Sequence, residues 1–507
     1  MAGTITSGAR VRSEAEILDD ARRLATRLAR AGIGAGDTLA LVMRNEIAFL
    51  TASVAANILG ATAVPVNWHF SAAEAAYVIR DCDARALIVH ADLWRRLAPD
   101  LPADLLAGKT VIAVDTPPEL ADAYGVPADL ARIPEGAEDL KDILRDCAPM
   151  AADKPVPLTA MIYTSGTTGN PKGVRRLGPS LPNKHGYGAI FKPGVRTLLP
   201  TPLYHSAPNR FGVMTFFCGG DLVLMPRFDA EELLRLVEAH RITAMFIVPT
   251  MLVRLLKLPP EVRAGYDLSS LSDVVCAGAP CPPEVKRGII EWWGECLYEF
   301  YGSTETGALT WCSSAEALER PGTVGRAVPS GTVKVFDAQG RECPPGVAGE
   351  VFGRLSDYAD FTYHKRAEDR GAVEHEGLIT SGDIGHLDAD GYLFLSDRKR
   401  DMIIAGGVNI YPAHIEAAML TFPGVVDAAV FGIPDAEMGE AICAILAPEP
   451  GQDLDEDALR AHLEGHIARY MLPKVIVVDP DLPRDASGKV NKRKLRDMYW
   501  SGTGRAI

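Results

Sequence analysis

Apolar positions in the first ninety residues follow a helical spacing and a strand spacing in turn. Between Ser13 and Ala31 apolar side chains recur at helical spacing, and glycines follow, so we predict a helix that ends there. Beyond it we expect strand Thr38–Met43, helix Ile47–Leu59, strand Ala61–Val66, helix Ala72–Asp81 and strand Ala86–His90. Alternating units of this size favour a parallel sheet with helices on both faces.

The same alternation returns in the middle of the chain. We predict strands at Arg196–Leu203, Leu222–Leu224, Ala244–Val248, Asp273–Ala277 and Cys296–Tyr301, with helices at Ala230–His240 and Glu284–Trp293. From Gly325 to Phe352 short strands alternate with Gly and Pro turns, which predicts a small antiparallel, barrel-like unit. The fold class is therefore α/β, with parallel-rich sheets layered with helices in a large N-terminal domain.

A change of pattern near residue 398 predicts a second domain. Ser396–Asp401 is a compact charged stretch that would suit a linker, and about 110 residues of mixed pattern follow it. We predict a large domain over residues 1–397 and a small, mobile α+β domain over 398–507. Its expected elements are helices Ala413–Leu420, Asp457–Tyr470 and Lys492–Tyr499 and strands Val426–Phe431, Ala441–Leu446 and Lys474–Val478.

The composition is that of a globular protein with more than one core. The chain has 507 residues, of which 47% are hydrophobic and 23% charged. Lys and Arg total 52 against 66 Asp and Glu, which gives a formal charge of −14. This charge repels nucleic acid and anionic lipid over long range, so an anionic substrate would need local hydrogen-bond donors.

Cysteine usage and hydropathy indicate a cytoplasmic protein. Nine cysteines without a Cys-x-x-Cys pair favour reduced thiols over a disulfide or zinc framework, and the first residues lack the features of a signal peptide. Ile47–Ala73 has no charged residue, which is also typical of a membrane-spanning helix. Pro65, Asn57 and Asn67 interrupt it, so we expect a buried helix and a strand there and no membrane span.

The stretch Tyr163–Val174 combines glycines, hydroxyls and one lysine after a short apolar run. Glycines let the backbone turn tightly and bring its N–H groups close to an anion, while the hydroxyls and the lysine add donors and charge. A phosphate cradle and a flexible surface loop both fit this stretch taken alone. The candidate residues are Thr164, Ser165, Gly166, Thr167, Thr168, Gly169 and Lys172.

A second loop of similar chemistry, Tyr301–Gly307, also follows a predicted strand. Loops at the carboxyl ends of parallel strands gather in one crevice. There Glu305 could hold Mg²⁺, Thr304 could reach a phosphate and Tyr301 offers a flat face for a base. The alternative is a Thr-Glu pair that caps the start of a helix.

Three further segments carry residues that would be ordinary on their own. Asp383 follows a turn and could accept the two hydroxyls of a ribose. His205 lies in a proline-bounded loop, where a lone histidine is more often structural than catalytic. Lys489 lies on the turn Pro483–Lys489, where most lysines are simply solvated.

Taken together, these stretches resemble the adenylate-forming superfamily of acyl-CoA synthetases, adenylation domains and luciferases. The resemblance runs from about Ser13 to Tyr499. It rests on Tyr163–Val174, Tyr301–Gly307, Thr380–Asp383, Asp397–Pro412 and Pro483–Lys489, in that order. The sequence of residues 394–404 resembles that of bacterial fatty-acyl and bile-acid-type CoA ligases.

The resemblance implies a role for each segment. Residues Thr164–Lys172 would bind the β- and γ-phosphates of ATP, and adenine would lie between Gly278, Ala279, Pro280 and the ring of Tyr301, with Gly302 beside it. Glu305 would hold Mg²⁺, and Asp383 and Arg398 would bind the ribose. The implied catalytic residues are Lys489, His205, Thr304 and Glu305. The implied co-substrates are ATP and CoA.

The resemblance also implies two half-reactions in two domain orientations. Lys489 would stabilise charge while a carboxylate attacks the α-phosphate, and the small domain would then rotate about a hinge near Arg400. Gly406 and Gly407 would next line the tunnel for the CoA thiol. Family members usually carry Asp or Lys at the hinge position, so Arg400 is a departure that we expect to preserve hinging.

The expected acyl pocket is deep and apolar. Acetate-activating relatives carry a bulky aromatic residue where this chain has Gly302, so we predict a large apolar acid, either of medium or long chain or alicyclic to polycyclic. The expected pocket residues are His205, Phe211, Val248, Cys276 and Gly302, with Val213, Met214 and Ala277 as further candidates. Arg210 could pair with a second polar group on the acid, but an exposed or internally paired arginine is the more common case.

Two alternatives to an acyl-CoA synthetase follow from the sequence. An acyl-AMP ligase that loads a carrier protein would usually carry an insertion before the hinge, and none is visible between Gly353 and Arg398. A silent ligand-binding relative would be expected to lack Lys489 or Glu305, and both are present. The sequence is compatible with a homodimer.

Overall fold

The computed structural model describes most of the chain in two compact units. The described residues are 3–134, 137–153, 155, 160–164, 171–178, 186–398, 401–405, 408–435, 437–449, 451–483 and 490–501. The larger unit comprises Met1–Val333 and Gly353–Ile379, and the smaller unit comprises Lys334–Phe352 and Thr380–Ile507. This division assigns Thr380–Arg398 to the smaller unit, whereas the sequence predicted a boundary at 397/398. Arg400 lies outside the described residues, so the predicted hinge stays a prediction.

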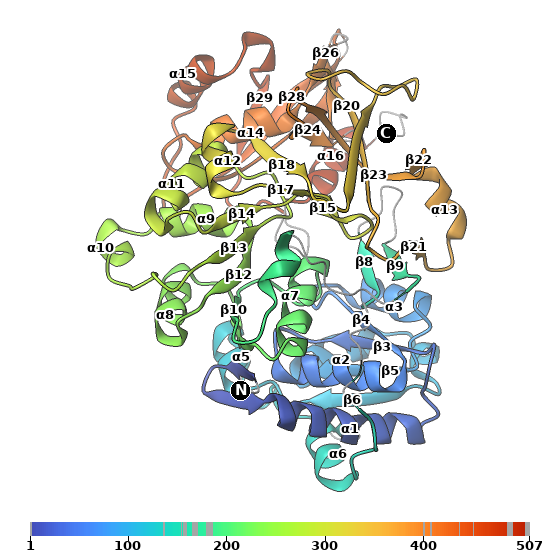
Figure 1. Ribbon diagram of the computed structural model, residues 1–507. Coiled ribbons are helices and arrows are strands. Elements are labelled where there is room, and N and C mark those ends of the chain that lie inside the picture. Colours follow the sequence, from blue (N-terminus) through green and yellow to red (C-terminus); the bar gives the residue numbers. More distant parts are fainter. Residues whose placement is uncertain are drawn as a thin grey trace. The chain divides into compact units, whose positions relative to one another are not determined.

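A five-stranded parallel sheet forms the first part of the larger unit, in the order β4-β3-β5-β6-β7 (Figure 1). Its strands are β3 (Thr38–Val42), β4 (Thr62–Pro65), β5 (Ala86–His90), β6 (Thr110–Val114) and β7 (Glu138–Asp139). The helices around it are α1 (Glu14–Arg30), α2 (Ile47–Leu59), α3 (Ala72–Asp81), α4 (Ala91–Leu97), α5 (Pro118–Tyr124) and α6 (Leu140–Asp146). The predicted strands and helices of this region are confirmed to within one or two residues.

A seven-stranded sheet forms the second part, in the order β14-β13-β12-β10-β11-β1-β2. All of its pairs are parallel except the N-terminal hairpin of β1 (Thr4–Ser7) and β2 (Arg10–Ser13). The other strands are β10 (Arg196–Leu199), β11 (Asp221–Leu224), β12 (Ala244–Ile247), β13 (Asp273–Cys276) and β14 (Leu297–Glu299). Helices α7 (Ser206–Phe217), α8 (Ala230–His240), α9 (Pro249–Leu256), α10 (Pro260–Arg263) and α11 (Pro283–Trp293) connect β10 to β14, and α12 (Ser314–Glu319) follows later in the chain.

The two sheets share one apolar core. Leu39 and Leu41 of β3 pack with α1, α2 and α7 against Phe246 and Val275 of the second sheet. The intervening Ala40 instead faces a core with α3 and α4. Alternate residues of a strand point to opposite faces, so one strand contributes to both cores. The result is a layered arrangement of helices, sheet, helices, sheet and helices, which is the parallel-rich large domain expected from the sequence.

Short antiparallel strands in the larger unit carry the polar loops. Strand β9 (Lys172–Arg176) lies between β8 (Ile162–Thr164) and β21 (Phe361–Tyr363). Strands β15 (Gly302–Ser303) and β16 (Gly307–Ala308) form a tight hairpin. The remaining short elements are β17 (Thr310–Trp311), β18 (Thr323–Ala327), α13 (Ala367–Ala372) and β22 (Glu374–His375), with 3-10 turns at Ala98–Asp100, Ala103–Leu106 and Gly186–Ile190.

The smaller unit contains the predicted hairpin and an α+β region. Strands β23 (Leu378–Leu387) and β24 (Tyr392–Arg398) pair antiparallel around Asp388–Gly391, where Gly391 has φ 82° and the Asp388 carboxylate accepts from two backbone N–H groups. The other elements are β19 (Gly331–Phe336), β20 (Gly349–Leu355), β25 (Ile403–Ala405), β26 (Val408–Ile410), α14 (Pro412–Leu420), β27 (Val425–Asp435), β28 (Gly439–Pro448), α15 (Glu456–His466), Arg469–Met471, β29 (Val475–Val478) and α16 (Lys492–Trp500).

Helix α7 is the main element that the sequence pattern did not predict. We expected a strand over Arg196–Leu203 and a loop around His205, but β10 ends at Leu199 and α7 begins at Ser206. Pro208 obscured the helix, although it lies in the first turn, where a missing backbone N–H costs no hydrogen bond. No helix among the described residues is long and apolar enough to cross a membrane.

Candidate functional site

The first polar loop joins two antiparallel strands. Thr164 pairs with Lys172 and Tyr163 with Gly173, so both ends of the loop are held in one β ladder. The strands on either side of the loop are therefore antiparallel neighbours, and the element that follows the loop is strand β9. Ser165, Gly166, Thr167, Thr168 and Gly169 lie outside the described residues, and their role at a phosphate stays a prediction.

Glu305 of the second loop meets the first loop and a third segment. The Thr164 Oγ1 lies 3.5 Å from Glu305 Oε1, and the Tyr363 hydroxyl donates to the same oxygen over 3.1 Å. Burial and the adjacent Glu305 carboxylate raise the pKa of Tyr363, so the phenol stays a donor. The structure thus brings the two predicted loops together at one carboxylate.

The backbone of the second loop is fixed by Arg176 of β9. Its guanidinium donates to the carbonyl oxygens of Thr304 and Glu305 and, over 2.9 Å, to that of Ala359. The same guanidinium lies 4.0 Å from the ring centroid of Tyr358. Inside the loop, the Ser303 hydroxyl accepts from the N–H groups of residues 305 and 306. The loop is a hairpin and starts no helix, so the alternative of a helix cap does not hold.

Lys172 has a carboxylate partner within the protein. Its ammonium is 2.8 Å from the Asp369 carboxylate and 5.2 Å from the ring centroid of Tyr363. Asp369, Lys172, Tyr363 and Glu305 therefore form a continuous polar row. A phosphate at the first loop would share the Lys172 ammonium with Asp369.

The two segments predicted to hold adenine follow neighbouring strands. Cys276 at the end of β13 pairs with Glu299 at the end of β14, and the Phe300 N–H donates to the Cys276 carbonyl over 3.2 Å. The turn Gly278–Pro280 and Tyr301 thus leave the same edge of the sheet. Gly278 has φ 93°, a conformation that favours glycine. Adenine could bind between the turn and Tyr301 only if both left the sheet at the same edge, as they do. The contact of adenine with either of them stays a prediction.

The structure gives a reason for glycine at position 302 that could not be inferred from the sequence. A Cβ at this position would lie 1.8 Å from the carbonyl oxygen of Gly307, because the two strands of the small hairpin approach closely there. In this backbone the absent side chain therefore has a structural cause of its own. The expectation that Gly302 borders a deep acyl pocket stays a prediction.

The expected acyl-pocket residues divide between the two faces of the second sheet. Phe211 is fully buried beside the rings of Phe191 and Phe246, in the core that also holds Ala277 and Val248. Cys276 is fully buried in the other core, under α8, α9 and α11. Adjacent strand residues point to opposite faces, so Cys276 does not line a pocket with Phe211, and we correct that expectation.

Helix α7 presents the other two residues of interest. His205 caps the N-terminus of α7 in extended conformation, and its ring lies 4.4 Å from that of Tyr204. Arg210 lies one turn further along, and its guanidinium is 5.6 Å from the ring centroid of Tyr358. The Tyr358 ring thus contacts both Arg210 and Arg176, which favours the internally paired interpretation of Arg210.

The remaining predicted residues belong to the smaller unit or lie outside the described residues. Asp383 of β23 pairs with Arg398 of β24, so the two expected ribose contacts are direct neighbours in the ladder. Arg400, Gly406, Gly407 and Lys489 fall outside the described residues and stay predictions.

Four residues of the site escaped the sequence analysis: Arg176, Tyr358, Tyr363 and Asp369. They come from β9 and from the segment of β21 and α13, far from Glu305 in the chain. No motif around them signalled a role. Only the register of β21 against β9 brings Tyr363 to Glu305.

The donor set around Glu305 suits Mg²⁺. Oxygen atoms of one carboxylate and neighbouring hydroxyls are hard ligands, and Mg²⁺ commonly binds one or two carboxylates together with substrate phosphates. Among the described residues, no cluster of three or more His, Cys, Asp or Glu side chains is arranged to hold a metal ion. The site therefore fits a metal that arrives with a nucleotide better than a metal held by protein alone.

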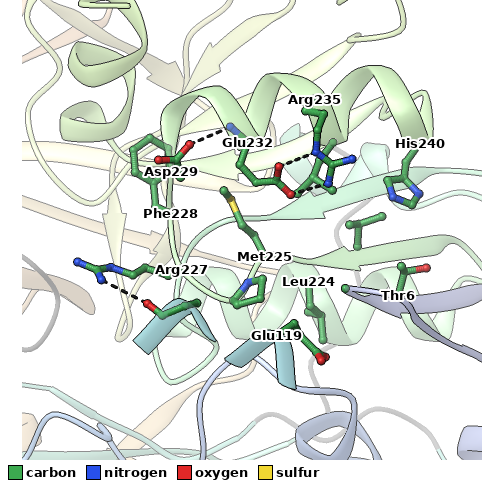
Figure 2. A pocket seen from close by; sticks show the side chains of 15 residues that line it. Thr6, Glu119, Leu224, Met225, Arg227, Phe228, Asp229, Glu232, Arg235 and His240 are labelled. Carbon is green, nitrogen blue, oxygen red and sulfur yellow. Dashed lines mark hydrogen bonds and ion pairs between the residues drawn. The ribbon is translucent and has the colours of Figure 1, made fainter. Parts of the chain in front are cut away.

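One cavity of the larger unit lies away from these loops. It has a volume of about 620 Å³ and lies between α8, α5 and the ends of β1 and β11. Figure 2 shows Glu232, Arg235 and His240 of α8 on one side and Glu119 and Thr6 on the other. Its carboxylates have internal partners, since Glu119 contacts Arg10 and Glu232 contacts Arg235. No residue predicted for ATP or acid lines it.

Comparison with protein families shows the family to which the chain belongs. The family model "AMP-binding enzyme" matches residues 7–355, more than half of the chain, and "AMP-binding enzyme C-terminal domain" matches residues 414–489. The chain belongs to the AMP-binding enzyme family. Both polar loops, with Glu305, lie within the first match, whereas Tyr363 and Asp369 lie just beyond its end. The resemblance to the adenylate-forming superfamily is confirmed.

Members of the family cover nearly the whole chain. An indoleacetate–CoA ligase of Aromatoleum aromaticum is 32% identical over 498 residues, covering 96% of this chain and 93% of that protein. The long-chain-fatty-acid–CoA ligase FadD13 of Mycobacterium tuberculosis is 32% identical, covering 94% and 91%. Among solved structures, ATP-bound MatB from Rhodopseudomonas palustris is similar with a TM-score of 0.81 and 27% identity, covering 99% and 96%. The predicted enzyme class and fold class are confirmed.

Proposed function

We propose that this AMP-binding enzyme converts a large apolar carboxylic acid to its CoA thioester in two steps. ATP-dependent formation of an acyl-CoA is the activity that the family and the named relatives support. The observation that carries the proposal is the meeting of Thr164 and Tyr363 at Glu305, where the two polar loops form one site.

In the first step, a carboxylate oxygen of the acid attacks the α-phosphorus of ATP. The bond from that phosphorus to the bridging oxygen breaks, and pyrophosphate leaves with its electron pair. Two anions must approach each other, so the site has to offset their repulsion. Bound at Glu305, Mg²⁺ would neutralise phosphate charge and stabilise the departing pyrophosphate.

The chain's own residues orient this site. Tyr363 holds one oxygen of Glu305, and Arg176 fixes the carbonyl groups of Thr304 and Glu305, so the carboxylate is positioned before substrate binds. Glu305 alone would repel a polyphosphate, which is a further reason for a cation between them. Lys172 supplies positive charge beside the loop that we assign to the β- and γ-phosphates.

In the second step, the thiol of CoA loses its proton to solvent and attacks the carbonyl carbon of the acyl-adenylate. The bond between that carbon and the phosphate oxygen breaks, which releases AMP and the thioester. We assign Lys489 to the first step and the segment of Gly406 and Gly407 to the second, with rotation near Arg400 between them.

The acid is proposed to be large and apolar because the side chains near α7 are apolar and aromatic. Phe211, Phe246, Val248 and Ala277 face the same core, and Phe300 packs against it. The relatives named above act on an indole acid and on long-chain fatty acids, as their names state. An apolar body with one carboxylate is the chemistry shared by these acids.

The test is an assay of pyrophosphate release over a panel of acids, with and without CoA. The panel contains acetate, decanoate, palmitate, indole-3-acetate and a steroid carboxylate. We expect pyrophosphate with the larger acids, and AMP and thioester in equal amounts once CoA is present. Pyrophosphate without thioester would favour loading of a carrier protein, and no pyrophosphate with any acid would favour a silent relative.

A further inference from the structure

One buried asparagine reaches from the first sheet to the segment that leads to His205. Asn45 follows β3, and 5% of its surface is exposed. Its side chain contacts the chain end of β10, the connection from β10 to α7, and the residue after β11. These segments are more than 150 residues from it in sequence, so the contact joins the two sheets of the larger unit.

Both ends of the Asn45 amide are engaged by backbone groups. Its Oδ1 accepts from the Leu203 N–H over 2.9 Å. Its Nδ2 donates to the carbonyl oxygens of Thr201 over 3.0 Å and Met225 over 3.3 Å, with the Leu199 carbonyl at 3.5 Å. An amide has two N–H donors, so the two shorter contacts account for both. The arrangement also defines which end is nitrogen, because carbonyl groups accept and the Leu203 N–H donates.

A second asparagine holds the same residue from the other side. Asn209 of α7 is buried and donates from Nδ2 to the Leu203 carbonyl over 3.0 Å. Both backbone groups of Leu203 are therefore bound by asparagine side chains, one from each side of the segment. Two residues later the chain reaches His205, whose N–H donates to the Pro202 carbonyl over 3.2 Å. The position of His205 is set by this short segment.

A segment without regular structure needs such contacts to hold one conformation. Residues 200–205 lie between a strand and a helix, so no ladder fixes their backbone. A buried backbone group without a partner is costly, and the asparagines supply partners that the sheets cannot. An apolar side chain at position 45 would fill the space but would leave the Leu203 N–H and the Thr201 carbonyl unpaired.

We propose that Asn45 is a positioning residue of the acyl site, which acts by holding residues 201–203 so that His205 faces the acid. The inference rests on the proposed function, because that function makes His205 part of the acyl site. Asn45 itself touches no substrate. Its substitution should weaken use of the acid and leave the binding of ATP near its original value.

The experiment compares two variants of Asn45 by their kinetics with acid and with ATP. Asn45→Leu removes both sets of hydrogen bonds, whereas Asn45→Asp keeps the acceptor for Leu203 and places a carboxylate oxygen against two carbonyls. We expect Asn45→Leu to raise KM for the acid about tenfold, with KM for ATP changed less than twofold. At neutral pH, the KM of Asn45→Asp for the acid should lie between that of Asn45→Leu and that of the unmodified enzyme.

A double-mutant cycle with His205→Ala separates positioning from a general structural role. If Asn45 acts through His205, Asn45→Leu should change KM for the acid little in the His205→Ala background. Additive effects on that KM would overturn the proposal. Equal rises in both KM values for Asn45→Leu would overturn it as well.

Thr38→Val is the matched control, because the Thr38 hydroxyl is also buried and donates to a backbone carbonyl, that of Cys82, over 2.6 Å. It should lower the melting temperature without changing KM for the acid. If Asn45→Leu does not fold, Asn209→Ala carries the test, since it removes one contact to the same Leu203. An unmodified enzyme without acid-dependent pyrophosphate release would contradict the proposed function instead, so the two failures are distinct.

Discussion

Tyr363 donates a hydrogen bond to Glu305 over 3.1 Å, and this contact joins two segments that no sequence motif connects. The same carboxylate oxygen lies near Thr164 of the first loop, so three separate segments converge on one atom. A carboxylate held in this way is oriented before a metal and a nucleotide arrive. Preorganised ligands of this kind lose little entropy on binding, which makes the contact a target for experiment.

Tyr363→Phe removes this contact while keeping the aromatic ring. A hydrogen bond to a charged group contributes about 1.5 kcal/mol, so we expect kcat/KM for ATP to fall roughly tenfold and to recover in part at high Mg²⁺. Titration of the rate with Mg²⁺ measures this. Tyr266→Phe is the control, because Tyr266 donates to Glu231 over 3.0 Å on the surface. An equal fall in kcat/KM for ATP in both variants would contradict a role for the Tyr363 hydrogen bond at the site.

Gly302→Ala tests the structural cause of that glycine. The added carbon would meet the Gly307 carbonyl, so the hairpin must shift, at a cost of about 1–3 kcal/mol. We expect a lower melting temperature and a similar fractional loss of activity with decanoate and palmitate. A selective loss with palmitate would show instead that position 302 limits acid size.

Cys276 and Ala277 provide a matched pair on opposite faces of β13 and its continuation. Cys276→Ala should lower stability by roughly 1 kcal/mol and leave the ranking of acids unchanged, because its side chain faces the helices. Ala277→Leu adds volume to the face of Phe211 and should shift preference toward shorter acids, by about tenfold. Ratios of kcat/KM for decanoate and palmitate measure the shift. If Cys276→Ala changed the preference among acids and Ala277→Leu did not, the acyl pocket would lie on the face of Cys276.

Lys489→Ala tests the assignment of Lys489 to the first step alone. Loss of a cation at the developing charge should slow acyl-adenylate formation on the order of a hundredfold or more. Thioester formation from a supplied acyl-adenylate should be largely retained, because the proposed mechanism assigns that step to the segment of Gly406 and Gly407. Single-turnover assays of each step give the comparison. Equal loss in both steps would contradict the two-orientation mechanism.

The sequence was most informative where the pattern was regular. Helix α2 and strand β5 have the predicted bounds, because Ile47–Leu59 is an uncharged, mostly apolar stretch that ends at Gly60 and Ala86–His90 is a short buried run. Helix α7 was missed because Pro208 resembles a helix breaker, although a proline in the first turn is tolerated.

The site was predictable as far as local motifs reach. Thr164 and Glu305 were expected to lie close together, and in the structure Thr164 Oγ1 is 3.5 Å from Glu305 Oε1. Tyr363 could not be predicted, because its place depends on the pairing of β21 with β9. The structural cause of Gly302 could not be predicted, since only the geometry of the hairpin shows that a Cβ would collide with Gly307.

The central claim is that the carboxylate of the acid attacks the α-phosphorus of ATP. The most direct measurement uses an acid labelled with ¹⁸O in both carboxylate oxygens and determines the mass of the AMP formed in the presence of CoA. The account predicts AMP that carries one ¹⁸O atom, with unlabelled pyrophosphate. Unlabelled AMP, or label in pyrophosphate or inorganic phosphate, would contradict it.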